Sequence, residues 1–574
     1  MVMRRSAAVA MLLVIAVAAG CVGPSNSQSA GSQTTADRPT PKRLTAAIRG
    51  TPAALSQQKT MRTVGNIPGL DAIEELTHAG MSHADDRGVL HPQLAEAVPS
   101  VENGLWRLFP DGRMETTWKI ESAARWHDGA PVTAEDFLFG ARVEQDRDLG
   151  VPGNATFDLI ETIEASDPHS LTVRWRRPFI EADAMFSYAI ALPIPRHLVE
   201  SAYTDDKATF LGIPYWTQEF IGTGPYRMRE WVLDSHMVLQ AYDGYVLGRP
   251  KIDEIEIRFI PDPNAIVATL LAEAADLTLG RSLLTVDQAQ EVINQWRDAR
   301  LATSYVSWAV VHSQFINTSP AIVSDVRFRR ALLHAIDRQQ MMETFMGGQS
   351  SITHTFVGPD SAEYREIESS IVRYAYDPRL ASQMIEGLGY TRGADGFFAD
   401  TAGQKLTVPI QTTIRSEINP KMLLAVADYW KQIGVEPDPF FVPIQRINDR
   451  ELRATFPAFE VLGAGDIGVS PDVVRRYHSS LVALPENRFQ VTGNNPRYRS
   501  PELDSLIERY VVTIPRADRM VLLGQIVHQL SDQIPSLGLF YVVDSTIFNK
   551  RISAMTKRTE RATQAWNAEE WDLG

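Results

Sequence analysis

The stretch of sequence that decides the fold runs over residues 124–136 and reads ARWHDGAPVTAED. Its Asp128-Gly129 pair is typical of a tight turn, because glycine adopts positive φ without a steric penalty. Thr133 is followed three residues later by Asp136, which resembles a capping box with aspartate in place of the usual glutamate. The stretch therefore predicts a turn and then the start of a helix. Its adjacent histidine and aspartate are also a conceivable catalytic pair, but the turn is the interpretation that we favour.

Outward from this stretch, strand and helix patterns follow one another irregularly. Apolar and polar residues alternate at 171–175, and a second strand-like run covers 252–259. Capping residues and apolar stripes at helical spacing predict four further helices. They lie at 265–275, from a Ser324 cap to Met346, from Ser500-Pro501 to Tyr510, and at 517–533. This mixture indicates an α/β or α+β protein.

The composition excludes several classes of protein. The chain has 574 residues, of which 44% are hydrophobic and 22% charged, as in folded globular proteins. The length predicts two to four domains, because single cores stop growing near roughly 250–300 residues. A net charge of −14 argues against nucleic-acid binding, which needs a basic surface. One cysteine excludes a disulfide framework and multi-cysteine metal centres.

The first residues predict an exported lipoprotein. Two arginines precede an apolar run at 7–19, which is too short to span a bilayer and is typical of a signal peptide. The exit, Ala-Ala-Gly before Cys21, resembles the bacterial lipobox, although Ala18 replaces the usual larger aliphatic residue. We therefore expect a signal peptide at 1–20 and lipidation of Cys21. An ordinary cleaved signal and twin-arginine export are the alternatives.

A polar linker follows the cysteine. Residues 22–41 are rich in Ser, Gln, Thr, Gly and Ala and lack apolar periodicity. We predict a flexible tether at 21–42 with a reach of about 25 Å, which follows from roughly 5–6 Å × √n. It would hold the protein on the outer face of the cell membrane or in the periplasm. Because no later stretch reaches 18 apolar residues, we expect no other membrane span.

Five motifs appear together and in a fixed order across about residues 65–550. They are the stretch at 124–136, GTGPY at 222–226 with Trp231 and the run 242–250, FIPD at 259–262, FINT at 315–318 with SDVRFRRAL at 324–332, and PELD at 501–504 through Ile534-Pro535. Together they resemble the family 5 extracellular solute-binding proteins, which are the peptide- and nickel-type receptors of ABC importers. One departure is Ala241, where the family usually has asparagine.

The resemblance implies the fold and the domain organisation. It implies an α/β, two-lobed fold like that of periplasmic binding proteins (type II, cluster C), with hinge strands and with the ligand enclosed between the lobes. Lobe I would comprise residues 43–302 plus 534–574, with a β-rich subdomain near 70–200. Lobe II would comprise 303–533. The partners implied are a small solute and an ABC permease and ATPase complex.

The resemblance also supplies ligand-binding candidates. Peptide-type members use an aspartate in a G-W-x-x-D segment to hold the α-ammonium of the ligand, and Asp466 matches that aspartate. Gly463 stands where the family usually has a tryptophan that lines the pocket, and this departure puts a standard peptide ligand in question. Asn317, in the fourth motif, is a further candidate. The alternative for Asp466 is a solvated loop carboxylate.

The segment that contains Gly463 and Asp466 also matches the sequence pattern of a dinucleotide-binding motif. Residues 463–468 read GAGDIG and follow an apolar run, as G-x-G-x-x-G does in nucleotide-binding folds. The context argues against a nucleotide, because Asp466 would place a carboxylate at the pyrophosphate and Ser470-Pro471 interrupts the required helix. We therefore expect no nucleotide and no other cofactor.

Three histidines form a weak metal-binding candidate. His78, His83 and His91 occur within 14 residues of one another, and imidazole suits zinc or nickel. The spacing lacks the His-Glu-x-x-His pattern of zinc enzymes, so solvated histidines are the interpretation that we favour.

The sequence therefore predicts a monomeric, lipid-anchored receptor that captures a small solute, foremost a peptide. A nickel-complex or other non-peptide receptor is the alternative within the class. Neither a nucleophile elbow nor a Walker loop occurs in the sequence, so we expect no enzymatic activity. A secreted hydrolase and a binding protein without a permease are the alternatives from other classes.

Overall fold

The computed structural model describes residues 41–56, 67–149, 155–188, 190–414, 416–490, 493–559 and 561–574. Residues 41–574 form one compact unit. The predicted signal peptide, the predicted lipidation site Cys21 and the predicted tether up to residue 40 lie outside the described residues. In the described part of the chain, no helix is both long enough and apolar enough to cross a membrane.

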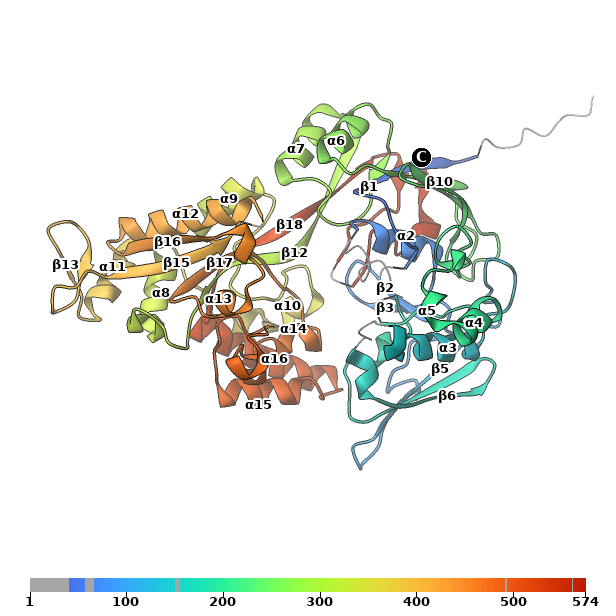
Figure 1. Cartoon of the computed structure of the whole chain (residues 1–574), viewed down its shortest axis with the longest axis horizontal. Helices are drawn as coiled ribbons and strands as arrows, with labels where there is room; N and C mark the ends of the chain where they lie inside the picture. Colours follow the sequence, from blue (N-terminus) through green and yellow to red (C-terminus); the bar gives the residue numbers. More distant parts are fainter. Residues whose placement is uncertain are drawn as a thin grey trace, which may run out of the picture. The chain divides into compact units, whose positions relative to one another are not determined.

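A ten-stranded sheet contains the two longest strands, which pair along nearly their whole length (Figure 1). β12 (Ala299–Ser313) and β18 (Ser536–Asn549) are antiparallel, with Ala299 opposite Asn549 and His312 opposite Ser536. β11 pairs with β18 at Phe548, near one end of the two strands, whereas β17 pairs with β12 near the other end, from Trp308 to Ser313. β12 and β18 therefore join two groups of elements, and we call them the hinge strands.

The strands on either side of the hinge strands define two lobes. Lobe I contains β1 (Arg43–Ile48), β8 (Tyr226–Val232), β9 (His236–Ala241), β10 (Glu254–Phe259) and β11 (Leu277–Thr278). Lobe II contains β15 (Thr407–Thr413), β16 (Glu436–Val442) and β17 (Phe459–Gly465). The sheet order is β16-β15-β17-β12-β18-β11-β1-β10-β9-β8. This arrangement is the two-lobed α/β fold with hinge strands that the resemblance implied.

Burial follows the sequence patterns strand by strand. β18 is apolar through most of its length and buried on both faces, as expected of a strand in the middle of a covered sheet. β10 alternates between half-buried and buried residues, and β7 (Ser170–Trp175) buries its apolar alternate residues. The strands predicted at 171–175 and 252–259 are therefore confirmed, the second with a later start.

Lobe I also carries a four-stranded antiparallel sheet with the order β4-β5-β7-β6. Its other strands are β4 (Trp106–Leu108), β5 (Met114–Lys119) and β6 (Ile160–Asp167), and a hairpin is formed by β2 (Ser82–Ala84) and β3 (Leu90–Pro92). The helices are α2 (Leu70–Thr77), α3 (Ala134–Gln145), α4 (Arg196–Asp205), α5 (Lys207–Phe210), α6 (Pro263–Leu271) and α7 (Val286–Gln295). The helix predicted at 265–275 is α6, which ends earlier.

The stretch at 124–136 has a structural role. The buried Asp136 completes the predicted capping box of α3, because its Oδ2 accepts the backbone N–H of Thr133 at 2.9 Å. Its Oδ1 accepts the N–H of Arg196, the first residue of α4, so one carboxylate caps two helices. His127 accepts the N–H of Gly222 with Nδ1 and donates from Nε2 to the carbonyl of Gly224. Burial lowers the pKa of His127 to about 4, so this histidine is a neutral structural link to the GTGPY loop.

The predicted helices of lobe II are confirmed except in one place. The helices of this lobe are α8 (Val326–His334), α9 (Arg338–Met346), α10 (Ala362–Ile367), α11 (Pro378–Glu386), α12 (Ile418–Gln432), α13 (Arg450–Ala454), α14 (Pro471–Arg475), α15 (Pro501–Tyr510) and α16 (Arg516–Gln533). The single helix predicted up to Met346 is wrong. Asp325, and not Ser324, caps α8, and Asp337 caps a separate α9 through the N–H of Gln340.

Each lobe has its own buried core, and a third cluster is shared. The core of lobe I includes Trp571 near the end of the chain, so the C-terminal segment 554–574 packs with lobe I. The core of lobe II surrounds Trp430 of α12. A further cluster contains Trp175 of lobe I, Trp308 of the hinge strands and Leu523 of lobe II. The two lobes are therefore in apolar contact beside the hinge.

Candidate functional site

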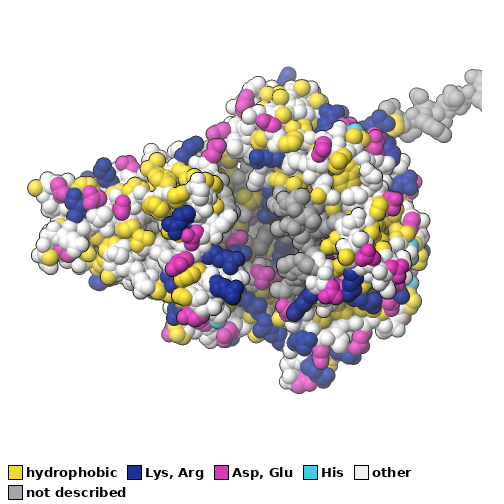
Figure 2. All heavy atoms as spheres, in the orientation of Figure 1, with side chains coloured by type: hydrophobic (Ala, Val, Ile, Leu, Met, Phe, Trp, Pro, Cys, Tyr) yellow, Lys and Arg dark blue, Asp and Glu magenta, His cyan; other side chains and the backbone are white. Residues whose placement is uncertain are grey.

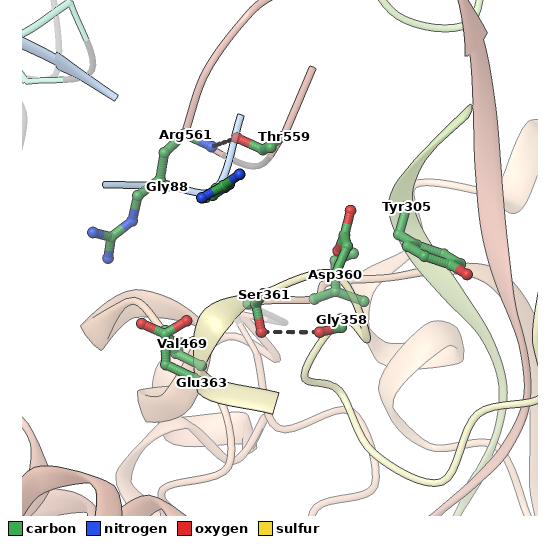
Figure 3. Close-up of a pocket in the computed structure, with 12 residues that line it drawn as sticks. Gly88, Tyr305, Gly358, Asp360, Ser361, Glu363, Val469, Thr559 and Arg561 are labelled. Carbon is green, nitrogen blue, oxygen red and sulfur yellow. Dashed lines mark hydrogen bonds between the residues drawn. The ribbon is translucent and has the colours of Figure 1, made fainter. Parts of the chain in front are cut away.

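A pocket with a volume of about 70 Å³ lies between the lobes (Figure 3). Lobe I contributes Arg87, Gly88, Thr559 and Arg561, and the hinge strands contribute Tyr305. The lining of lobe II comes from the segment 358–363, which includes the start of α10, and from the loop 467–469. It consists of Gly358, Asp360, Ser361, Glu363, Ile467, Gly468 and Val469. Figure 2 shows the surface hollowed between the two lobes. The site is therefore built by segments far apart in the sequence.

The charged groups of the pocket are sorted by lobe. Both guanidinium groups, of Arg87 and Arg561, belong to lobe I, and both carboxylates, of Asp360 and Glu363, belong to lobe II. Three of the four have an ion-pair partner: Arg561 with Glu181 at 2.7 Å, Asp360 with Lys557 at 2.8 Å and Glu363 with Arg516 at 3.2 Å. The cationic groups therefore lie on the lobe I side of the pocket and the anionic groups on the lobe II side, and most of them are already paired.

One of these ion pairs crosses from lobe to lobe. Lys557 lies in the C-terminal segment of lobe I, and its Nζ is 2.8 Å from Oδ2 of Asp360 in lobe II. Nearby, burial raises the pKa of Asp183 in lobe I to about 6, although Arg561 and Arg519 of α16 act in the opposite direction. Electrostatic contacts thus accompany the apolar contact between the lobes.

Tyr305 is presented to the pocket by an irregularity of the hinge strands. The register of β12 against β18 shifts between Tyr305 and Ser307, and such bulges redirect side chains at binding sites. The Tyr305 ring packs edge-on against Tyr541 with centroids 5.3 Å apart. The Tyr541 hydroxyl donates to the carbonyl of Val357 at 2.6 Å, immediately before the pocket residue Gly358. The hinge strands and the lobe II loop are therefore mechanically connected.

The glycine-rich segment at 463–468 is explained by close packing. A Cβ on Gly465 would lie 2.2 Å from Nε1 of Trp308, so only glycine leaves room for that indole. A Cβ on Gly463 would lie 3.0 Å from Oδ1 of Asn419 in α12. Gly468 has a φ of 120°, which favours glycine, and its N–H donates to the carbonyl of Phe356. These contacts account for all three glycines without a nucleotide.

The three ligand-binding candidates that the resemblance supplied lie in different parts of the structure. Asp466 directly precedes the lining residues 467–469, but its own carboxylate is 49% exposed and pairs with Arg476 at 2.5 Å. Gly463 faces α12, so a tryptophan in its place would require α12 to move. Asn317 is exposed in a turn with a φ of 56°, beyond the end of β12. Within the described residues, none of the three lines the pocket.

The three histidines do not converge. His78 is buried, with Nδ1 3.0 Å from the Thr223 hydroxyl and Nε2 2.8 Å from the Pro193 carbonyl. His83 is also buried, and its ring lies 6.0 Å from that of the exposed His91. Among the described residues, no group of three or more His, Cys, Asp or Glu side chains has the arrangement of a metal site.

Apart from Ile467 and Gly468, which lie in the segment 463–468, sequence reasoning missed the residues that line the pocket. Arg87, Asp360, Thr559 and Arg561 lie on loops, and Tyr305 lies in a strand whose pattern is otherwise ordinary. Their signal is spatial, because the lining of the pocket comes from five separate segments of the chain. The one local signal was the Asp-Arg-Gly turn at 86–88, which indicates an exposed hairpin tip but not what it faces.

Comparison with known proteins places the chain in a family. Residues 90–480 match the model of the family described as bacterial extracellular solute-binding proteins, family 5 middle, which is more than half of the chain. The chain is similar to the oligopeptide-binding protein AppA of Bacillus subtilis, with 21% identity over 506 residues, 87% of each chain.

Two solved structures have the same fold. One is AppA of Bacillus subtilis in complex with a nonapeptide, with a TM-score of 0.64, 19% identity and coverage of 93% of this chain and 100% of the other. The other is NikZ of Campylobacter jejuni in complex with Ni(L-His), with a TM-score of 0.66, 19% identity and the same coverage. With the match over 90–480, these findings show that the chain belongs to the family 5 bacterial extracellular solute-binding proteins.

Proposed function

We propose that this chain is the solute receptor of an ABC importer and that it binds a peptide between its two lobes. The observation that carries the proposal is the pocket itself, which is lined by both lobes and by the hinge strands between them. Ligand sites in two-domain receptors lie where the domains meet. The peptide is favoured by the name of the relative AppA and by its structure with a nonapeptide.

In this proposal the hinge strands let the lobes close over the solute. The moving bodies are 43–302 plus 534–574 and 303–533. Closure of this kind concentrates the conformational change in a few residues at element ends. The cross-lobe contacts, such as the pair between Lys557 and Asp360, would form and break as the lobes move. The closed receptor would deliver its solute to a permease and ATPase complex.

We further propose that Asp466 holds the ammonium group of the peptide, as the resemblance implies. Its position next to the lining residues supports this role, and its ion pair with Arg476 means that the ammonium must replace that guanidinium. If the closed lobes bury this pair, loss of Asp466 should cost about 2–5 kcal/mol, or roughly 30- to 5000-fold in affinity. Titration calorimetry of Asp466→Ala tests the role, with Asp472→Ala as the control expected to change affinity about tenfold or less. Equal affinity of wild type and Asp466→Ala would remove the anchor.

We also propose that the protein is exported, anchored through a lipid on Cys21, monomeric and without catalytic activity. The apolar run at 7–19 and the residues before Cys21 support the first two points. Cys21→Ser should abolish metabolic fatty-acid labelling and membrane retention. Unchanged labelling of this variant would contradict the anchor.

The decisive experiment for the function is native mass spectrometry of the purified residues 41–574, followed by calorimetry with the molecule retained. A retained peptide that binds saturably and is recovered uncleaved is the expected result. A retained metal complex would favour the second candidate, a receptor for a nickel complex, which rests on the structure of NikZ with Ni(L-His). Turnover of the retained molecule would contradict both candidates.

A further inference from the structure

Arg87 differs from every other charged residue that lines the pocket. The carboxylates of Asp360 and Glu363 and the guanidinium of Arg561 are each neutralised by an ion pair within the protein. No described residue forms an ion pair or a side-chain hydrogen bond with the guanidinium of Arg87, which is exposed. Among the described residues that line the pocket, one charge is therefore uncompensated, and that charge is positive.

The backbone beneath this side chain is held firmly. Arg87 lies at the tip of the hairpin between β2 and β3, where Oδ1 of Asp85 accepts the N–H groups of Arg87 and Val89, both at 2.9 Å. Oδ2 of the same carboxylate bonds to Nε2 of His91 at 3.0 Å. Because both carboxylate oxygens of Asp85 are bonded within the hairpin, Asp85 fixes the backbone at Arg87 and does not pair with the Arg87 guanidinium. A fixed backbone reduces the entropy that a binding arginine loses.

The neighbouring hydroxyl group is also arranged as a donor. Oγ1 of Thr559 accepts the N–H groups of Arg561 and Ala562 at 3.3 and 3.1 Å. Its hydrogen is therefore left to donate, and no described residue receives it in a hydrogen bond. Figure 3 shows Gly88, the chain neighbour of Arg87, on the same side of the pocket as Thr559 and Arg561, with Asp360 and Ser361 across from them.

We infer that the lobe I wall is an anion subsite in which Arg87 and Thr559 bind a carboxylate group of the solute. A guanidinium offers two parallel N–H groups that match the two oxygens of a carboxylate. The unpaired charge of Arg87, which lies in lobe I, also orients the solute. Its carboxylate end lies against Arg87, and any ammonium end points to lobe II. This inference rests on the proposed function and adds to it the specificity determinant and the direction of binding.

The test compares an alanine pentapeptide with its C-terminal amide, by calorimetry on residues 41–574 freed of retained solute. Wild type should bind the acid about 10- to 100-fold more tightly than the amide, because a charged hydrogen-bonded pair is lost with the amide. Arg87→Gln should lower the affinity for the acid by the same factor and leave the amide unchanged. Arg87→Lys should fall between, since it keeps the charge but not the two parallel N–H groups. N-acetylation of the acid should not abolish the preference.

The control is Arg107→Gln, which removes an exposed arginine of β4 outside the pocket and should change neither affinity. The ratio of acid to amide affinity is a readout that a mere change of stability would not move. An equal affinity of wild type for acid and amide, or an unchanged ratio in Arg87→Gln, would overturn the inference and leave the peptide function standing. Binding of neither pentapeptide, together with binding of Ni(L-His), would overturn the peptide function. In that case, the affinities of wild type and Arg87→Gln for Ni(L-His) test the inference on the carboxylate of that complex. If neither the pentapeptides nor Ni(L-His) bind, both the proposed function and the inference are overturned.

Discussion

Two neighbouring residues of the C-terminal segment form ion pairs of opposite character. Arg558 bonds to Asp71 of α2 at 2.7 Å inside lobe I, and these side chains are only 2% and 13% exposed. Lys557 bonds to Asp360 at 2.8 Å across the two lobes, with side-chain exposures of 31% and 22%. The Arg558–Asp71 pair fixes the C-terminal segment to lobe I. The Lys557–Asp360 pair connects the surface of that segment to lobe II.

The surroundings of the two pairs show why they differ. Near Arg558 the buried atoms Nε of Arg558, Oε1 of Glu75 and Oδ2 of Asp544 have no hydrogen-bond partner among the described residues. A charge in such a place is costly to leave unpaired. Lys557 and Asp360 keep access to water, so either can be solvated when the pair opens. A receptor that closes and reopens needs the second kind of pair between its lobes and the first kind within a lobe.

The largest effect is expected from breaking the buried pair. Arg558→Met leaves Asp71 without its partner and should destabilise the protein by about 3–5 kcal/mol, the usual cost of an uncompensated buried charge. The urea midpoint of residues 41–574 measures this effect. The double variant Arg558→Met, Asp71→Asn should recover part of the loss. A single variant as stable as wild type would show that the pair does not hold the segment.

A second effect concerns the titration of Glu75, which faces the same pair. Burial raises the pKa of Glu75 from 4.5 to about 7; the Thr563 hydroxyl and Arg558 act against the shift, and Asp71 acts with it. Between pH 4.5 and 7 the folded state therefore holds a proton on Glu75 that the unfolded state has lost. The stability that this proton contributes is complete below pH 4.5 and is lost as the pH rises through 7. At about 1.36 kcal/mol per pH unit, the loss approaches ~3 kcal/mol.

Glu75→Gln should remove this dependence, measured as the difference in urea midpoint between wild type and variant from pH 4.5 to 8. The difference is the proper readout, because burial also raises the pKa of Glu569 to about 7 and adds to the slope of both proteins. A pH-independent difference would mean that Glu75 does not titrate in this range.

These contrasts also show what the sequence alone could predict. The turn and the cap at 124–136 could be predicted because they depend on neighbours along the chain, and the fold followed from the family resemblance that the five ordered motifs carry. The helix break at Asp337 was missed, because Arg338 is buried by bonds to the carbonyls of Thr353, Tyr374 and Gly538, which are far away in sequence. The pocket was missed for the same reason, since Arg87, Asp360 and Thr559 meet only after folding. Local order can be read from local sequence, whereas a site between two lobes cannot.

A smaller effect is expected from the cross-lobe pair. Lys557→Met and Asp360→Asn should each change the unfolding free energy by at most about 1 kcal/mol, because partly exposed ion pairs contribute little. Both should nevertheless enlarge the radius of gyration of the ligand-free protein in small-angle scattering, since the lobes lose a contact. The double variant should add nothing beyond either single variant. Independent, additive effects would show that the two side chains do not act as a pair.

The smallest effect, and the finest test of the comparison, is the response of the two pairs to salt. Screening lengths fall from about 10 Å at 0.1 M to about 3 Å at 1 M salt, and screening acts on exposed charges far more than on buried ones. The difference in melting temperature between wild type and Lys557→Met should therefore shrink toward zero at 1 M salt. The difference between wild type and Arg558→Met should persist, because that pair is nearly buried. If both differences shrink together, the C-terminal segment opens as a whole, and Arg558 is then no more protected from solvent than its neighbour.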